Sequence, residues 1–245
     1  MNIFSVKADT PVGKFLRLPL KIIPKGSSVP ILFTRARGKK WIAGSGPHSC
    51  WLGLNEIGKR KLFTKTVKPG HIVFDVGANV GSYTILGSVL VGQEGKVMAF
   101  EPVPENIKFL KNHIVLNKLM NVEVFETAVT DYCGTAKFNV SADRVLGSIS
   151  ENGNITVTAT TLDKIVQEKG VSPDCIKIDV EGGEAAVLEG ARRVLRECRP
   201  IVFVATHSQD VHRKCLEILN LERYSVRTIA NQEDELIALP VTDKI

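Results

Sequence analysis

The sequence predicts an α/β fold in which helices cover both faces of a mostly parallel, doubly wound β-sheet. From residue 71 onward, short apolar runs of strand length alternate regularly with amphipathic stretches of helix length. This alternation is typical of βαβ units, in which each helix returns the chain to the start of the next parallel strand. The expected strands lie near 71–76, 96–101, 122–128, 174–180 and 200–206, and the expected helices near 81–91, 104–118, 183–198 and 208–220.

Two parts of the chain depart from this alternation. Only a polar turn separates the apolar segments 224–229 and 235–240, so we expect a C-terminal antiparallel hairpin there. Between about residues 130 and 160 the segments 135–140 and 155–161 have β character and flank a loop, and a helix follows near 162–169. We expect this region to be a β insertion that reaches the ligand edge of the sheet.

The basic residues are concentrated ahead of the regular pattern. Residues 1–70 hold 14 Lys and Arg against two acidic residues, although the net charge of the whole chain is only +6. We therefore expect a basic N-terminal extension or cap over residues 1–66 and the α/β domain over residues 67–245. The extension is explained equally well as a solvated tail or as a contact for an anionic partner such as a phosphate-bearing substrate, nucleic acid or a lipid surface. Residues 15–23, apolar but basic, could lie on a membrane surface.

Composition favours a protein of a reducing compartment. Five dispersed cysteines form no CxxC pair, so we expect free thiols and a cytoplasmic location. No apolar run approaches the roughly 18 residues needed to span a bilayer.

The residues with the most chemical content follow the first two expected strands. Asp75 ends an apolar run, and the loop Gly77-x-Asn79-x-Gly81 follows it. This spacing fails the GxGxxG pattern of dinucleotide-binding proteins. The next strand ends in Glu101, and an acid at that position can accept hydrogen bonds from ribose hydroxyls. Together these features fit a nucleoside that lacks a pyrophosphate, such as S-adenosylmethionine.

An ordered set of motifs narrows this prediction. The segments 75–84 (DVGANVGSYT), 99–102 (AFEP), 161–163 (TLD) and 176–182 (IKIDVEG) occur in this order within about residues 68–200. The set resembles the FkbM family of class I, S-adenosylmethionine-dependent methyltransferases. The resemblance implies a Rossmann-like, seven-stranded sheet whose last strand is antiparallel. It also implies transfer of a methyl group to a hydroxyl of a sugar, glycolipid, polyketide or similar metabolite.

The same resemblance implies the cofactor site. Glycines 77 and 81 with Asn79 would line the methionine and sugar part, Asp75 would hold the amino acid end directly or through water, and Ala128 would lie near the adenine. The full set of expected cofactor-binding residues is Asp75, Gly77, Asn79, Gly81, Tyr83, Glu101, Pro102, Ala128 and Asp179.

Three residues are candidates for catalysis. Asp179 and Glu181 follow the fourth expected strand, at the edge of the sheet where ligands bind. A carboxylate there could act as a base, orient the acceptor or hold the ammonium group of the cofactor. His207 follows the fifth strand, and the near-neutral pKa range of histidine suits a general base. His113 and His212 fall in helical patterns and are expected to be structural or exposed.

The sequence predicts no metal, because no His or Cys spacing calls for one. Asp179, Glu181 and His207 could form a metal site only if the fold brings them together.

Two alternatives to O-methylation remain. The basic segment could bind RNA for methylation, or the chain could be a non-catalytic cofactor-binding module docked to an anionic partner. The acceptor and the oligomeric state do not follow from the residues.

Overall fold

The structure is a computed structural model of the 245-residue chain, and it describes residues 20, 22–140, 147–150, 152–229 and 232–241. Of the expected membrane-surface segment 15–23, residues 15–19 and 21 lie outside the described residues. Among the residues that are described, no helix has the length and apolar character needed to cross a membrane.

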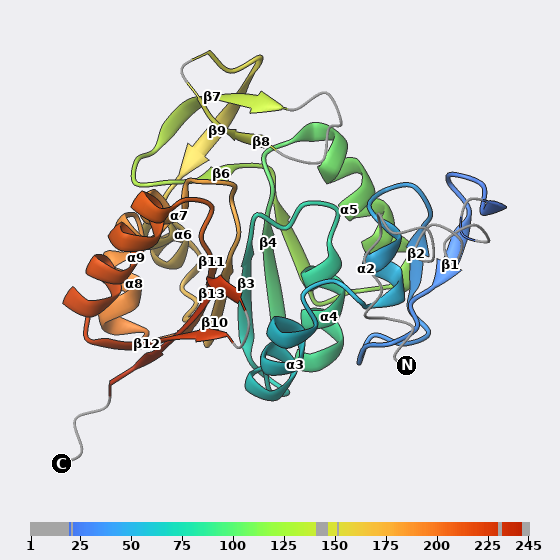
Figure 1. Ribbon diagram of the computed structural model, residues 1–245, viewed down its shortest axis with the longest axis horizontal. Coiled ribbons are helices and arrows are strands. Elements are labelled where there is room, and N and C mark those ends of the chain that lie inside the picture. The colour runs from blue at the N-terminus through green and yellow to red at the C-terminus, as the bar shows by residue number, and fades with distance from the viewer. Residues whose placement is uncertain (1–19, 21, 141–146, 151, 230–231, 242–245) are drawn as a thin grey trace.

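A seven-stranded sheet forms the centre of the molecule (Figure 1). Its strands run in the order β12-β13-β11-β10-β3-β4-β5, and all neighbours are parallel except β13, which is antiparallel to both β11 and β12. The predicted mostly parallel sheet with a C-terminal antiparallel hairpin is confirmed. The strands are β3 (Ile72–Val76), β4 (Lys96–Phe100), β5 (Val122–Phe125), β10 (Cys175–Ile178), β11 (Ile201–Ala205), β12 (Tyr224–Ile229) and β13 (Gln232–Pro240).

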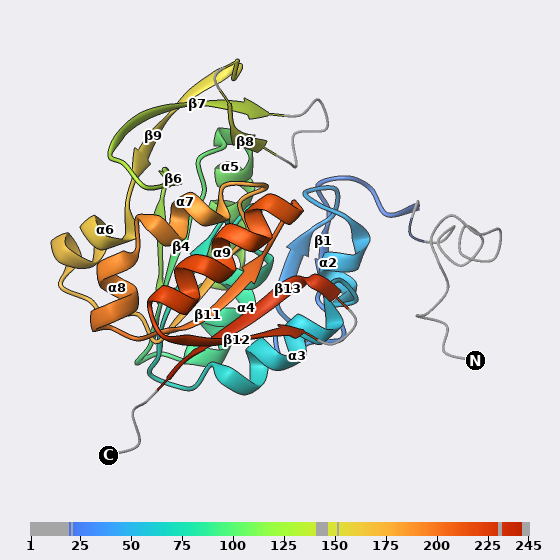
Figure 2. The same cartoon turned by 60° about the vertical axis from the view of Figure 1, so that its left-hand side comes forward.

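Helices cover both faces of this sheet, as Figures 1 and 2 show. Successive residues of a strand point to opposite faces, so Phe74 and Val76 pack in one core while Val73 packs in the other. The first core is closed by α6 (Leu162–Lys169), α7 (Glu184–Glu189), α8 (Arg192–Glu197) and α9 (Gln209–Leu221), and the second by α3 (Ile57–Thr66), α4 (Ser82–Val91) and α5 (Pro104–Asn117).

Two predicted elements differ from those observed. The strand expected over 122–128 leaves the sheet after Phe125, and Ala128–Val129 forms β6 of a second sheet. The single helix expected over 183–198 is broken into α7 and α8. Asp163 causes part of this break, because its carboxylate accepts hydrogen bonds from the backbone N–H groups of Arg193 and Val194 and so caps a new helix start.

The second sheet lies above the carboxyl ends of the main strands (Figure 1). Its order is β6-β9-β7-β8, and it contains the two β segments expected between residues 130 and 161. Its own small core is formed by residues such as Phe138 and Val157. The strands are β6 (Ala128–Val129), β7 (Gly134–Val140), β8 (Gly147–Ile149) and β9 (Ile155–Thr160).

The residues ahead of β3 pack onto the domain. They form the hairpin of β1 (Ser28–Pro30) and β2 (Lys40–Ile42), then α2 (His48–Leu52) and α3. Trp41 is fully buried and stacks on His113, with ring centroids 4.2 Å apart. His113 accepts from the backbone N–H of Ile42 through Nε2 at 2.9 Å, so its Nδ1–H donates to the carbonyl of Val80 at 2.8 Å. His113 is structural, as predicted, and burial lowers its pKa.

Candidate active site

The loop between β3 and α4 has a backbone that few residues tolerate. Gly77, Asn79 and Gly81 all have positive φ, at 72°, 52° and 98°, a region that favours glycine and to a lesser degree asparagine. A Cβ on Gly77 would lie 1.9 Å from the carbonyl oxygen of Asp179. Glycine is therefore required at this position for the β3–α4 loop to contact the end of β10.

Glu101, at the end of β4, holds this loop in place. Its Oε2 accepts a hydrogen bond from the backbone N–H of Asn79 at 2.8 Å, and Oε1 accepts from Val103 N–H and from Asn106 Nδ2. The side chain is 4% exposed, and burial raises the pKa of Glu101 although these three bonds oppose the shift. A carboxylate offers about four acceptor positions, so one on Oε2 remains for a ligand hydroxyl.

Asp75 and Lys177 form a buried ion pair across β3 and β10. They are direct neighbours in the register of the two strands, and Lys177 Nζ lies 3.2 Å from Asp75 Oδ1. Thr84 donates its hydroxyl hydrogen bond to the other oxygen at 2.6 Å. Asp75 is 1% exposed and is not among the residues that line the cavity described below, so its expected role at the amino acid end, directly or through water, stays a prediction. Although burial opposes it, Asp75 and Asp179 raise the pKa of Lys177, which is therefore charged.

A second buried lysine extends this network into α3. Lys59 is 0% exposed, and its Nζ lies 2.7 Å from Glu56, 2.8 Å from Glu235 on β13 and 3.9 Å from Asp179. Burial opposes its charge, but the three carboxylates raise the pKa of Lys59. Burial also raises the pKa of Glu235 to about 7. Asp179 therefore has lysines from two directions beside one of its oxygens, since Lys177 lies 3.8 Å from the same Oδ2.

A cavity of about 220 Å³ brings these elements together. Seven of the nine expected cofactor residues line it, whereas Asp75 and Gly81 do not: Gly77, Asn79, Tyr83, Glu101, Pro102, Ala128 and Asp179. The part of the chain ahead of β3 and the second sheet supply other walls: Gly46, Pro47, Cys50, Asn55 and Glu56 from the former, and Phe138 and Ile149 from the latter. Three separate stretches of sequence thus meet around one space.

Tyr83 contributes an unsatisfied donor to this cavity. Its side chain is 5% exposed, and the hydroxyl has no hydrogen-bond partner within the described part of the chain. Lys59 and Lys177 lie 5.6 Å from its ring centroid and Arg60 lies 4.8 Å away, a range in which cations are attracted to an aromatic ring. A buried donor without a partner is costly, so this hydroxyl marks a place where a ligand acceptor fits.

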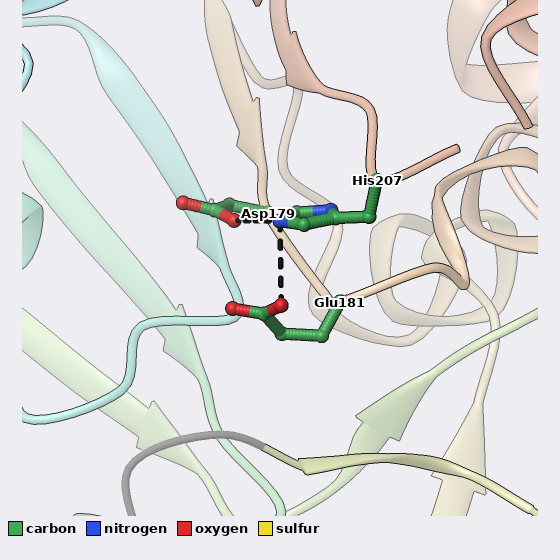
Figure 3. A group of neighbouring side chains, drawn as sticks. All are labelled: Asp179, Glu181 and His207. Atoms are coloured by element: carbon green, nitrogen blue, oxygen red, sulfur yellow. Dashed lines mark ion pairs between the residues drawn. The ribbon is translucent and has the colours of Figure 1, made fainter. Parts of the chain in front are cut away.

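The three predicted catalytic residues lie together beyond the ends of β10 and β11 (Figure 3). Nε2 of His207 is 3.6 Å from Asp179 Oδ1 and 3.4 Å from Glu181 Oε2. Asp179 and Glu181 line the cavity, whereas His207 is not among its lining residues. Glu181 has a left-handed backbone, with φ at 55°.

His207 is held from behind by a residue that sequence reasoning did not select. Glu184, fully buried at the start of α7, accepts from His207 Nδ1 at 2.8 Å and from the backbone N–H groups of Val180 and Gly182. The hydrogen bond to Glu184 raises the pKa of His207 to about 9. Burial opposes this rise, and the negative charges of Glu181 and Asp179 add to it. The expected near-neutral histidine is therefore corrected: with these neighbours alone, His207 is protonated at pH 7.

Sequence signals existed for some of the missed residues and not for others. Lys177 interrupts an otherwise apolar strand in which every position is buried, and a charge at such a position is a sign of a buried pair. Lys59 is one of 14 basic residues in its segment, and nothing in the sequence distinguishes it. Glu184 belongs to the matched motif region but carries no signal of its contact with His207.

Comparison with known proteins agrees with this geometry. The model of the methyltransferase FkbM domain matches residues 75–227, more than half of the chain. Hexuronic acid methyltransferase AglP of Haloferax volcanii is 24% identical over 178 residues, covering 71% of this chain and 72% of that protein. The 31-O-demethyl-FK506 methyltransferase FkbM of Streptomyces tacrolimicus is 26% identical over 207 residues, covering 70% and 78%.

Solved structures share the fold. A methyltransferase FkbM from Methylobacillus flagellatus superposes with a TM-score of 0.51 at 18% identity, covering 79% of this chain and 55% of that one. The chain thus spans just over half the length of that protein. An S-adenosylmethionine-dependent O-methyltransferase from Thermotoga maritima gives a TM-score of 0.50 at 15% identity, covering 93% and 82%. The chain is therefore an enzyme with S-adenosylmethionine as its methyl donor, and it belongs to the FkbM family of methyltransferases.

Proposed function

We propose that the protein methylates a hydroxyl group of a saccharide, glycolipid, polyketide or similar polyhydroxylated metabolite. The observation that carries this proposal is the layout of one cavity. Its wall holds most of the residues expected at the cofactor, together with Glu181, and His207 lies within 3.6 Å of both Asp179 and Glu181. The names of two relatives, a hexuronic acid methyltransferase and a 31-O-demethyl-FK506 methyltransferase, support an oxygen-rich acceptor.

The cavity suits the methyl donor in shape and charge. The backbone at Gly77 allows close approach, Glu101 keeps one acceptor position for a ribose hydroxyl, and the Tyr83 hydroxyl offers a donor. The carboxylates around Asp179 would face the positive charges of the donor, and Asp75 would act through Lys177. When bound, S-adenosylmethionine supplies an electrophilic methyl carbon on a sulfonium.

The residues at the end of β10 and β11 would act on the acceptor. As the acceptor oxygen attacks in line, its O–H bond breaks, the new O–CH₃ bond forms and the bond from sulfur to the methyl carbon breaks. The released proton has to go to a nearby group. We assign this step to Asp179, Glu181 and His207 as a unit, because Nε2 of His207 lies 3.6 Å from Asp179 Oδ1 and 3.4 Å from Glu181 Oε2.

The N-terminal residues and the β insertion would select the acceptor. Residues 1–66 are proposed to be a cap on the methyltransferase domain of residues 67–245, because Pro47 and Asn55 line the cavity. The β insertion at about 130–160 contributes Phe138 and Ile149 to the same space. Loops added to a common scaffold commonly carry specificity.

The test is methyl transfer from isotopically labelled S-adenosylmethionine to a panel of neutral saccharides, uronic-acid saccharides and RNA. We expect label in a saccharide or related hydroxyl compound, and we expect it to survive mild alkali because a methyl ether is stable where a methyl ester releases methanol. Asp179→Asn should lower the rate by about 100-fold or more, whereas Asp210→Asn, at an exposed acid on α9, should not. Label confined to RNA, or lost as methanol, would contradict O-methylation of a metabolite.

RNA methylation is the alternative in this test. The positive charge of the N-terminal residues favours it, but Lys59 and Arg60 are buried beside the cavity and are not part of the basic surface. A cytoplasmic location stays a prediction from the cysteine pattern.

A further inference from the structure

The cluster of Asp179, Glu181 and His207 has the composition of a metal site. One ligand atom from each lies within 4.8 Å of the other two. The two carboxylates come from the end of β10 and the imidazole from the end of β11, so the order of the sheet brings them together (Figure 3). One imidazole and two carboxylates form a mixed donor set of the kind that divalent transition metals accept.

The separations suit an ion between the three groups. His207 Nε2 lies 3.4 Å from Glu181 and 3.6 Å from Asp179, and good N–H···O hydrogen bonds are about 2.7–3.2 Å long. Metal–ligand bonds of about 2.1 Å place neighbouring ligand atoms about 3.0 Å apart in an octahedron and about 3.4 Å apart in a tetrahedron. Small side-chain movements would therefore close the set around an ion.

A buried carboxylate orients the histidine as a ligand. Glu184 is 0% exposed and accepts hydrogen bonds from His207 Nδ1 at 2.8 Å and from the backbone N–H groups of Val180 and Gly182. Because Nδ1 donates to Glu184, Nε2 is the ring nitrogen that faces Asp179 and Glu181, and a metal ion would displace the proton on it. Carboxylate–histidine–metal arrangements of this kind are common in metal centres.

The charge around the cluster is a separate observation. One connected set of ion pairs joins six carboxylates to only two lysines and His207. The lysines contact Oδ2 of Asp179, which leaves Oδ1 facing His207. Acidic groups outnumber cations even if Glu235 is protonated and His207 is charged. This surplus of negative charge favours cationic ligands at the site, which include a metal ion as well as the methyl donor.

We propose that Asp179, Glu181 and His207 bind a divalent transition-metal ion. Their side chains are 26%, 32% and 31% exposed, so water or substrate can reach the open coordination positions, as in catalytic metal sites. Two of the three ligands line the cavity. If the proposed hydroxyl methylation is correct, the ion would coordinate two adjacent oxygens of the acceptor, which favours a vicinal diol or a hydroxy acid. This last step rests on the proposed function, whereas the metal site does not.

A titration of the full chain with Mn²⁺ tests the site. The free Mn²⁺ is measured by electron paramagnetic resonance, with no cofactor or acceptor present. We expect saturation at one equivalent. Affinity should fall by more than about 100-fold in Glu181→Gln and His207→Gln, and by about 10–100-fold in Glu184→Gln. Glu189→Gln is the control, because Glu189 is a half-exposed carboxylate on the same helix as Glu184. This variant should bind Mn²⁺ with the same affinity as the unsubstituted protein. Thermal melting followed by circular dichroism identifies variants that fail to fold. If His207→Gln or Glu184→Gln does not fold, Glu181→Gln decides the test, because its side chain is partly exposed.

Absence of saturable Mn²⁺ binding, or equal affinity in Glu181→Gln and His207→Gln, would overturn the metal site. Activity separates this failure from that of the proposed function. Mn²⁺ binding without methyl transfer to any hydroxyl compound would support the metal site and contradict the proposed function. If the protein does not bind Mn²⁺ and its methyl transfer continues in the presence of a metal chelator, the metal site would be contradicted and the proposed function supported.

Discussion

Replacement of Lys177 by methionine tests whether the buried ion pair behind the cavity stabilises the fold. Lys177 is 3% exposed, lies 3.2 Å from Asp75 and donates a hydrogen bond to the carbonyl of Gly77 at 2.7 Å. At an effective dielectric constant of about 20, two charges at this distance attract each other by about 5 kcal/mol. Methionine keeps much of the side-chain length but leaves the carboxylate of Asp75, 1% exposed, without its cation.

Removal of one partner of a buried pair typically costs about 3–5 kcal/mol in the free energy of unfolding. A domain of this size loses about 2–4 °C of Tm per kcal/mol, so Lys177→Met should lower the Tm by roughly 6–20 °C. Thermal and urea unfolding followed by circular dichroism measure both quantities. Lys169→Met is the matched control, because Lys169 pairs with Glu123 at the surface, where the two side chains are 40% and 31% exposed. Such a pair is worth about 0–1 kcal/mol.

The double variant Asp75→Asn/Lys177→Met completes the cycle. Because it removes both charges, it should be more stable than Lys177→Met alone, which would show coupling between the two residues. The reasoning is refuted if Lys177→Met loses no more stability than Lys169→Met, or if Asp75→Asn brings no recovery.

Three further changes test the cavity and its surroundings. Gly77→Ala should lose several times more stability in urea unfolding than Gly92→Ala, since both glycines have φ near 70° but only at Gly77 would the new Cβ meet a backbone carbonyl, at 1.9 Å; equal losses would contradict a required close approach. Glu101→Gln should weaken S-adenosylmethionine binding in calorimetry by about 10–150-fold, because hydrogen bonds to a charged group contribute about 1.5–3 kcal/mol, and unchanged affinity would refute its role at the ribose. The pKa of His113 is lowered in the folded state, so the stability that its neutral form provides is complete above its unfolded pKa of about 6.5 and is lost as pH falls below that value. Both tryptophans lie ahead of β3, so the midpoint of unfolding by tryptophan fluorescence should fall more steeply from pH 7 to pH 5.5 in the original protein than in His113→Gln, and parallel curves would exclude this cause.

Much of the fold could be predicted because local patterns determine it. Apolar strands and amphipathic helices alternate, and the positions of Glu101 and Asp179 at strand ends follow from that alternation alone. The break between α7 and α8 could not be predicted, because it depends on a cap from Asp163 and on contact with the second sheet. Both are contacts between segments remote in sequence.

The site shows the same division. The sequence places Asp179, Glu181 and His207 at strand ends, but their proximity depends on β11 lying beside β10. Asp75 is recognisable as an acid at the end of a strand, yet its role depends on the register that sets it opposite Lys177. Lys59 reaches the site from a segment with no recognisable motif, so only the folded structure identifies it.

The packing of the N-terminal residues has a practical consequence for defining the smallest active fragment. A fragment cut to residues 75–227, the stretch that matches the family, would lose β13, which lies inside the sheet between β11 and β12. It would also lose Lys59, Trp41 and Phe63, which are 0%, 0% and 1% exposed in the whole chain. Asp179 and an apolar face of the sheet depend on these residues, so the limits of the family match are the wrong place to trim this protein for expression or for exchange of acceptor specificity between relatives.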